Sequence, residues 1–166
     1  MKRTVLLILP LCMILVISGC NSSDDRVNQT NDSEKSLRVS SESESKMIED
    51  VNIKLYLNDK EVEVIWENNA AIEEIFKDVK NNDLIVEMSM YGGFEQVGDL
   101  GKRYTQNDKQ ITTKSGDIVI YGGDKIVVFY GSNTWEYTKL GKINESEYTI
   151  TNLLSKGNIE LKISKD

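Results

Sequence analysis

Five residues near the glycine-rich stretches of the chain have side chains suited to binding. They are Tyr91, Phe94, Glu95, Arg103 and Trp135. Partly exposed aromatic rings can form a binding platform, because they join a large apolar surface to a polar edge. An arginine offers five fixed hydrogen-bond donors to a carboxylate or a carbonyl, and a carboxylate accepts hydrogen bonds or titrates. We predict that these residues form a ligand-binding site.

Each candidate also has a structural interpretation. The aromatic rings could pack inside the fold or cover its rim. Arg103 could be a surface ion-pair partner, and Glu95, which follows Gly92-Gly93, could accept hydrogen bonds from a turn. Asp117, which follows Gly116, is expected to serve a turn rather than a site. The sequence leaves these alternatives open.

The composition excludes several kinds of chemistry. There is no histidine, so a Ser-His-Asp triad and a histidine zinc site are excluded. The only cysteines are Cys12 and Cys20, and neither is expected to lie in the folded part. No Asp-x-Asp-x-Asp-Gly calcium loop and no phosphate-binding glycine motif occurs. We therefore predict no catalytic residue, no metal site and no cofactor.

The first 20 residues have the features of an export signal. Lys2 and Arg3 precede an apolar run from Val5 to Ile17, which ends at Ser18-Gly19-Cys20. This ending resembles the lipobox of bacterial lipoproteins. The resemblance implies that residues 1–19 are a signal peptide and that Cys20 receives a diacylglyceryl group, with acyl chains such as palmitate. The alternative is an uncleaved membrane helix, but spanning requires ~20 apolar residues and this run contains Pro10.

A lipidated Cys20 places the mature protein at the cell membrane, facing outside the cytoplasm. Two acyl chains give stable anchoring, because each buried methylene contributes about 0.8 kcal/mol. Removing Lys2 and Arg3 with the signal changes the formal charge from −7 to about −9. An acidic chain without a cluster of basic residues is not expected to bind nucleic acid.

A polar segment separates the lipid from the folded part. Residues 20–47 contain the acylated cysteine and a tract rich in Ser, Asp, Glu and Asn, which cannot bury enough surface to offset the cost of ordering. We expect a disordered tether, although the tract could itself be a recognition peptide. Residues 48–166 then form one domain.

The domain is predicted to be mainly β. Apolar residues alternate from residue 51 to 57, from 62 to 66 and from 84 to 90. Further short strands are expected beyond the glycine-rich turns, over residues 118–121, 125–130, 135–137, 140–143 and 159–163. Asn68-Asn69 can cap a helix, after which Ala71, Ile72, Ile75, Phe76 and Val79 recur at helical spacing. Closely spaced strands with one or two helices favour a closed barrel, because closure removes edge strands.

The globular part resembles the bacterial cyclophilin-like domain family. The similarity lies in the order of several segments, which are residues 53–57, Asn68-Asn69-Ala70-Ala71, residues 90–95, residues 115–121, residues 126–130 and residues 135–143. It implies a β-barrel of about eight strands with helices closing its ends. Cyclophilin isomerases use an arginine within a Phe-His-Arg strand. This chain lacks that sequence, and the context of Arg103 does not match it.

We therefore predict a membrane-anchored lipoprotein whose cyclophilin-like domain is a non-enzymatic binding module for an unknown small molecule or exported protein. One alternative is a peptidyl-prolyl isomerase-like folding helper for exported proteins. A second is a lipoprotein that captures a solute. Fold similarity alone does not decide among them, because activity depends on the site.

Overall fold

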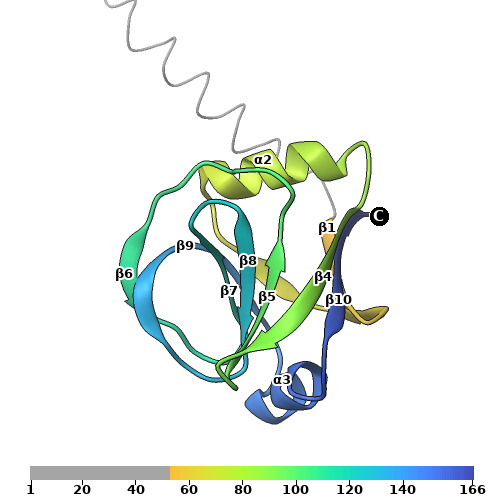
Figure 1. Ribbon diagram of the computed structural model, residues 1–166. Helices are drawn as coiled ribbons and strands as arrows, with labels where there is room; N and C mark the ends of the chain where they lie inside the picture. Colours follow the sequence, from red (N-terminus) through yellow and green to blue (C-terminus); the bar gives the residue numbers. More distant parts are fainter. Residues whose placement is uncertain (1–52) are drawn as a thin grey trace, which may run out of the picture.

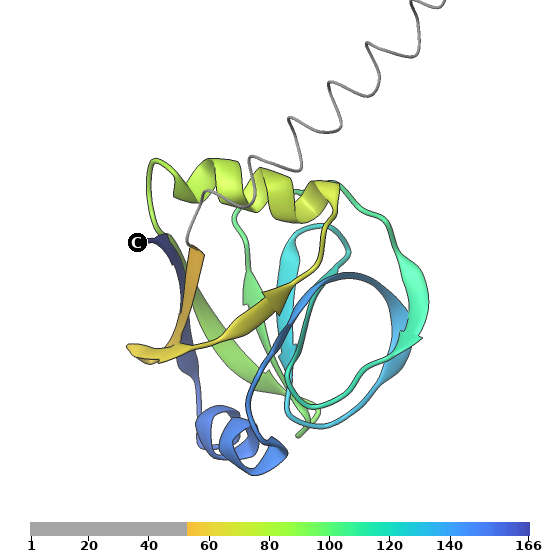
Figure 2. The same ribbon diagram turned by 180° about the vertical axis from the view of Figure 1, so that it is seen from behind.

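The computed structural model describes residues 53–166 (Figures 1 and 2). The strands are β1 (Ile53–Leu57), β2 (Lys60–Val62), β3 (Val64–Trp66), β4 (Leu84–Tyr91), β5 (Glu95–Asp99), β6 (Lys109–Thr112), β7 (Asp117–Tyr121), β8 (Lys125–Phe129), β9 (Thr134–Ile143) and β10 (Ile159–Lys165). The helices are α2 (Ala70–Val79) and α3 (Glu147–Leu154). The signal peptide, Cys20, the tether and residues 48–52 lie outside the described residues.

The strands form a nearly closed antiparallel barrel. Their order is β2-β1-β10-β4-β5-β8-β7-β9-β3, and β6 pairs only with β9. Only Glu63 separates β2 from β3, so a single bent segment pairs with β1 at one end of the order and with β9 at the other. With β2 and β3 counted as one strand and β6 set aside, eight strands remain. The predicted barrel is confirmed.

The helices cover the ends of the barrel. Figure 1 shows α2 across one end and α3 at the other, and Figure 2 shows the same from behind. Asn69 caps α2 as predicted, because its Oδ1 accepts a hydrogen bond from the Ile72 amide at 3.1 Å. All five apolar residues predicted for this helix are buried. No helix within residues 53–166 is long and apolar enough to span a membrane.

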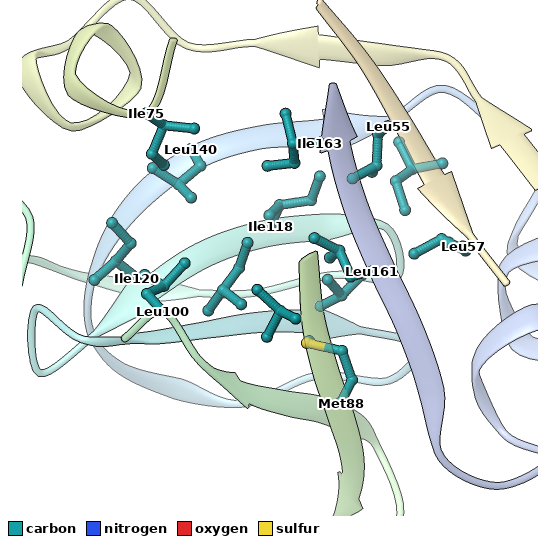
Figure 3. Packing of buried hydrophobic residues seen from close by; sticks show 14 of the residues in the cluster. Leu55, Leu57, Ile75, Met88, Leu100, Ile118, Ile120, Leu140, Leu161 and Ile163 are labelled. Carbon is teal, nitrogen blue, oxygen red and sulfur yellow. The ribbon is translucent and has the colours of Figure 1, made fainter. Parts of the chain in front are cut away.

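The main hydrophobic core fills the inside of the barrel. Alternation places Ile118 and Ile120 of β7 and Leu161 and Ile163 of β10 inward, and each is fully buried (Figure 3). The buried face of α2 packs against the same core, so the helix and the strands share one apolar interior.

A second, smaller cluster lies on the outer face of β5, β7 and β8. It consists of Val119, Val127, Phe129 and Tyr137, with Phe94, Val97 and Ile111 packed against it. The strand pair β6–β9 contributes Ile111 and Tyr137, and Figure 1 shows this pair standing to one side of the barrel. Strands β5, β7 and β8 are therefore apolar on both faces where β9 and β6 cover their outer side.

Two tight turns lie at opposite ends of the β5–β8 strand pair, because Glu95 pairs with Phe129 and Asp99 pairs with Lys125. Gly92 and Gly93 have φ values of 61° and 78° and connect β4 to β5, so that Tyr91 pairs with Glu95. A second Gly-Gly turn connects β7 to β8, so that Tyr121 pairs with Lys125. Positive φ at two successive positions is the conformation that glycine adopts without strain.

Candidate functional site

A pocket of about 360 Å³ opens beside the outer cluster. Its lining residues come from β4, β5, β7, β8 and β9 and from the segment before β9. They are Tyr91, Glu95, Val97, Tyr121, Lys125, Val127, Asn133, Trp135 and Tyr137. The volume lies in the range of small-molecule sites. The apolar floor, formed by Val97 and Val127, belongs to the outer cluster.

Glu95 is the buried charged group of this pocket. It is 7% exposed, although it begins β5 directly after the turn, because it lies between its cross-strand neighbours Tyr91 and Phe129. Its Oε2 has no hydrogen-bond partner within the part of the chain that the structure describes. Burial raises the pKa of this carboxyl to about 7, because the charged form loses its hydration.

Tyr137 lies against the floor of the pocket. Its ring is 5% exposed and packs edge-on against Phe129 and Tyr121, with centroid separations of 5.7 and 6.1 Å. Its hydroxyl accepts a hydrogen bond from Asn133 Nδ2 at 3.0 Å. Burial, and then the charge of Glu95, raise the pKa of Tyr137. The phenol therefore stays neutral beside the carboxyl.

The remaining aromatic side chains form an exposed rim. Tyr91 is 68% exposed, Trp135 is 56% exposed and Tyr121 is 46% exposed. Large aromatic side chains are usually more buried than this, and three of them around one pocket present a concentrated apolar surface to solvent. The rim can therefore contact a ligand without any movement of the backbone.

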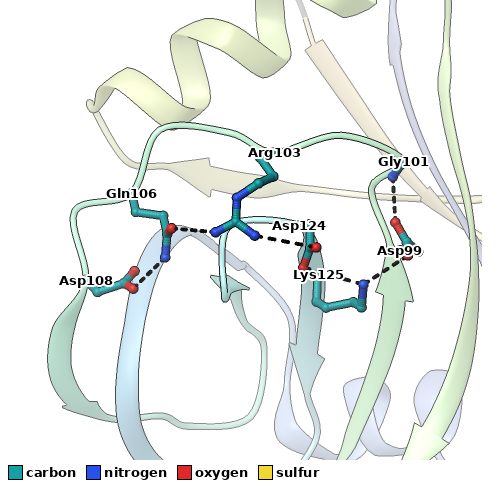
Figure 4. Close-up of polar contacts among 7 residues, drawn as sticks. All are labelled: Asp99, Gly101, Arg103, Gln106, Asp108, Asp124 and Lys125. Atoms are coloured by element: carbon teal, nitrogen blue, oxygen red, sulfur yellow. Dashed lines mark hydrogen bonds and ion pairs between the residues drawn. The ribbon is translucent and has the colours of Figure 1, made fainter.

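Lys125 lines the pocket, and its ammonium group contacts two carboxylates outside the lining. Its Nζ lies 2.9 Å from Asp99 Oδ2 and 3.4 Å from Asp124 Oδ1 (Figure 4). The hydrogen bond with Asp99 raises the pKa of Lys125 and lowers that of Asp99. Two carboxylates thus hold this charge.

The sequence model of the cyclophilin-like family matches residues 55–164. The chain belongs to the cyclophilin-like family. A search of curated proteins and a search of solved structures gave no match.

The cyclophilin-like barrel brings together three of the five candidates predicted from the sequence. Tyr91, Glu95 and Trp135 line one pocket. Phe94 does not line it, and its ring instead stacks on Phe129 with centroids 6.5 Å apart in the outer cluster. The Phe94 carbonyl also accepts hydrogen bonds from two backbone amides after β8, both at 2.9 Å. Phe94 therefore supports the turn that positions Glu95.

Arg103 lies on the surface, apart from the pocket lining. Its side chain is 65% exposed, and its guanidinium contacts Gln106 at 3.1 Å and Asp124 at 3.7 Å (Figure 4). Asp117, which was expected to serve a turn, accepts a hydrogen bond from the Lys114 amide at 2.8 Å. Among residues 53–166, no group of three or more acidic side chains could hold a metal ion.

Sequence reasoning missed several pocket residues as site candidates. They are Val97, Tyr121, Lys125, Val127, Asn133 and Tyr137. A signal was present for Tyr121 and Lys125, because they flank Gly122-Gly123 as Tyr91 and Glu95 flank Gly92-Gly93. The two hairpins are neighbours because β5 pairs with β8, and antiparallel pairing places their turns at opposite ends of that pair.

Proposed function

We propose that this protein is a membrane-anchored extracytoplasmic lipoprotein whose cyclophilin-like domain binds a ligand without catalysis. The N-terminal part of the proposal is supported by the lipobox-like ending at Cys20. The binding part is supported by the pocket around Glu95. The partner is a small molecule or an exported protein.

One observation carries the proposal of binding. A carboxyl group that is nine-tenths buried has an oxygen with no hydrogen-bond partner in residues 53–166, and exposed aromatic side chains line the same pocket. Buried polar atoms are nearly always paired, because an unpaired one loses its hydration without compensation. A ligand that fills the pocket would supply the missing partner.

The lining of the pocket favours binding over catalysis. None of its nine residues is an arginine, serine, threonine or cysteine, and Lys125 is held by two carboxylates. Arginine is the group that the resemblance associates with the isomerases, and Arg103 lies outside the lining.

The anchoring is tested on the native protein and on a Cys20→Ala variant. Mass spectrometry of the native protein should show an N-terminus at Cys20 that carries a diacylglyceryl group. The variant should lack lipid and accumulate with its signal attached. An unmodified Cys20 in the native protein would refute the anchoring.

The binding is tested by thermal unfolding of the purified full-length protein against a library of small solutes. A ligand should raise the melting temperature with occupancy, and Trp135→Ala should abolish the shift. Tyr148→Ala is the matched control, because Tyr148 is an 80% exposed aromatic residue outside the pocket. An assay of proline cis/trans exchange tests the isomerase alternative. Acceleration that depends on the pocket would replace the binding proposal with that alternative.

A further inference from the structure

The unpaired carboxyl indicates what kind of group the pocket accepts. No side chain or backbone group of residues 53–166 donates a hydrogen bond to Glu95 Oε2. An ionised carboxylate only accepts hydrogen bonds, so its natural complement is a group with several N–H donors and a positive charge. Such a group would offset the loss of hydration that burial imposes on Glu95.

The rim around Glu95 suits the same kind of group. Tyr91, Tyr121 and Trp135 are all partly exposed at one pocket, and the face of an aromatic ring attracts a cation through its quadrupole. Aromatic rings together with a carboxylate provide both an apolar surface for an alkyl chain and attraction for its charged end. An anionic ligand would meet the carboxylate and the negative faces of the rings.

The cation already present in the pocket does not occupy this position. Lys125 Nζ lies at 2.9 Å from Asp99 and 3.4 Å from Asp124, and its charge is not among the causes of the pKa shift of Glu95. The Lys125 ammonium is therefore paired with Asp99 and Asp124. It does not serve as the positively charged partner of Glu95.

We propose that the pocket binds an organic ammonium group, which pairs with the carboxylate of Glu95 and packs against Tyr91, Tyr121 and Trp135. The group is carried by a small free amine or by a lysine side chain of an exported protein. This inference rests on the proposed function, because it names the chemistry of the ligand at the same site.

Ammonium binding at Glu95 depends on pH in a predictable direction. The other titratable side chains that line the pocket are Tyr91 from β4, Tyr121 from β7, Lys125 from β8 and Tyr137 from β9. Phenol and ammonium groups ordinarily titrate above pH 8, so Glu95 is the group that changes charge near neutrality. With its pKa at about 7, the carboxyl is mostly protonated at pH 6 and mostly ionised at pH 8, so affinity should rise about tenfold between them.

The experiment compares two pairs of probes by calorimetry on the purified full-length protein. N-acetyl-lysine methylamide is paired with N-acetyl-norleucine methylamide, and butylammonium is paired with butanol. The two members of each pair have similar alkyl chains, and only one of them carries an ammonium group at its end. We expect the charged member to bind at least tenfold more tightly at pH 8. Comparing butylammonium with the lysine probe distinguishes a free amine from a peptide side chain.

Three variants separate the role of charge from that of folding. Glu95→Gln should abolish the preference for the charged probes and the rise of affinity with pH, whereas Glu87→Gln, a change at an exposed site on β4, should alter neither. Tyr91→Ala removes a 68% exposed side chain, so it should weaken the binding of every charged probe without unfolding the protein.

The outcomes also separate this inference from the proposed function. Tighter binding of norleucine or butanol would overturn the ammonium inference and leave a ligand-binding pocket in place. Affinity for the charged probes that rises toward low pH would also overturn it, because a protonated Glu95 would then be the partner. No binding of any probe up to about 10 mM would overturn it as well, while the solute library still tests the proposed function.

Discussion

The two faces of the β5–β8–β7 sheet differ in what they contain. On the inner face, Ile118, Ile126 and Val128 are fully buried in a core that includes residues from both helices and from the other strands. On the outer face, a smaller apolar cluster ends at Glu95, a buried carboxyl with an unpaired oxygen. The inner face stabilises the barrel, and the outer face carries a group that costs stability. A group of that kind points to binding rather than to folding.

The largest effect should come from the inner face. Ile118→Ala removes a fully buried side chain and should lower the free energy of unfolding by about 2–5 kcal/mol, because it leaves a cavity in a close-packed core. Tyr121→Ala, on the same strand but at the outer rim, should cost about 1 kcal/mol or less. Urea unfolding measures both. Equal losses would contradict the proposed division between the faces.

Glu95→Gln should remove a pH-dependent cost from the outer face. Below pH 4.5 the carboxyl is protonated in the folded and unfolded states alike. As pH rises toward 7, the unfolded state releases this proton and the folded state keeps it, so the free energy of unfolding falls. Above pH 7 the loss levels off at about 3 kcal/mol, because the pKa rises from 4.5 to about 7 on folding.

The measurement is the difference in unfolding free energy between Glu95→Gln and the unchanged protein at pH 4, 6 and 8. Taking the difference cancels the opposite contributions of carboxyls with lowered pKa values, such as Asp78 and Asp99. The variant should gain relative stability as pH rises. A difference that stays constant with pH would show that Glu95 has an ordinary pKa in the folded state.

Gly98→Ala should disturb the inner face from β5. A Cβ at this position would overlap Val86 Cγ1 and would lie 2.5 Å from Met88 Sδ, both within the packed core. We expect a loss of about 1–3 kcal/mol from overpacking, measured by urea unfolding. Glu87→Ala, an exposed change on the neighbouring strand, should stay within about 0.5 kcal/mol. Similar small losses for both would indicate a looser inner face than the contacts suggest.

The smallest effect should come from Arg103→Ala. The ion pair with Asp124 is long and the side chain is 65% exposed, so the free energy of unfolding should change by less than about 0.5 kcal/mol. Ligand affinity should not change, because Arg103 does not line the pocket. Weaker binding in this variant would add Arg103 to the outer-face site.

The sequence predicted the elements whose pattern is local. The helix over Ala70–Val79 was recognisable from a capping asparagine and five apolar residues at helical spacing. The turn at Gly92-Gly93 was visible as two glycines that interrupt an alternating strand. In both cases the residues that determine the element lie within about ten positions of one another, so a local sequence pattern is enough to predict it.

The elements that depend on distant partners were missed or divided. Strand β6 has one half-buried residue, Ile111, and its pairing with β9 is what extends it. Strand β9 was expected as two short strands but runs continuously from Thr134 to Ile143, because its first half pairs with β6 and its second with β7. In α3 only Ile150 and Leu154 are buried, which is too few for a clear helical pattern.

The candidate site shows the same limit. Tyr91 and Glu95 lie together because one turn joins them, and sequence proximity was enough to suggest it. Trp135 reaches the same pocket through the course of β9. Arg103 has the right chemistry for a site, but the loop after β5 directs it to Asp124 on the surface. Residue type predicted what these side chains could do, and topology decided which of them meet.

The position of the last strand determines when this domain can become complete. Strand β10 lies between β1 and β4, so residues near the end of the chain join the first strand to the rest of the barrel. A ribosome makes the chain from its N-terminus, and β1 and β4 therefore each keep an open edge until Ile159–Lys165 have been made. Closure of the barrel must follow the synthesis of β10.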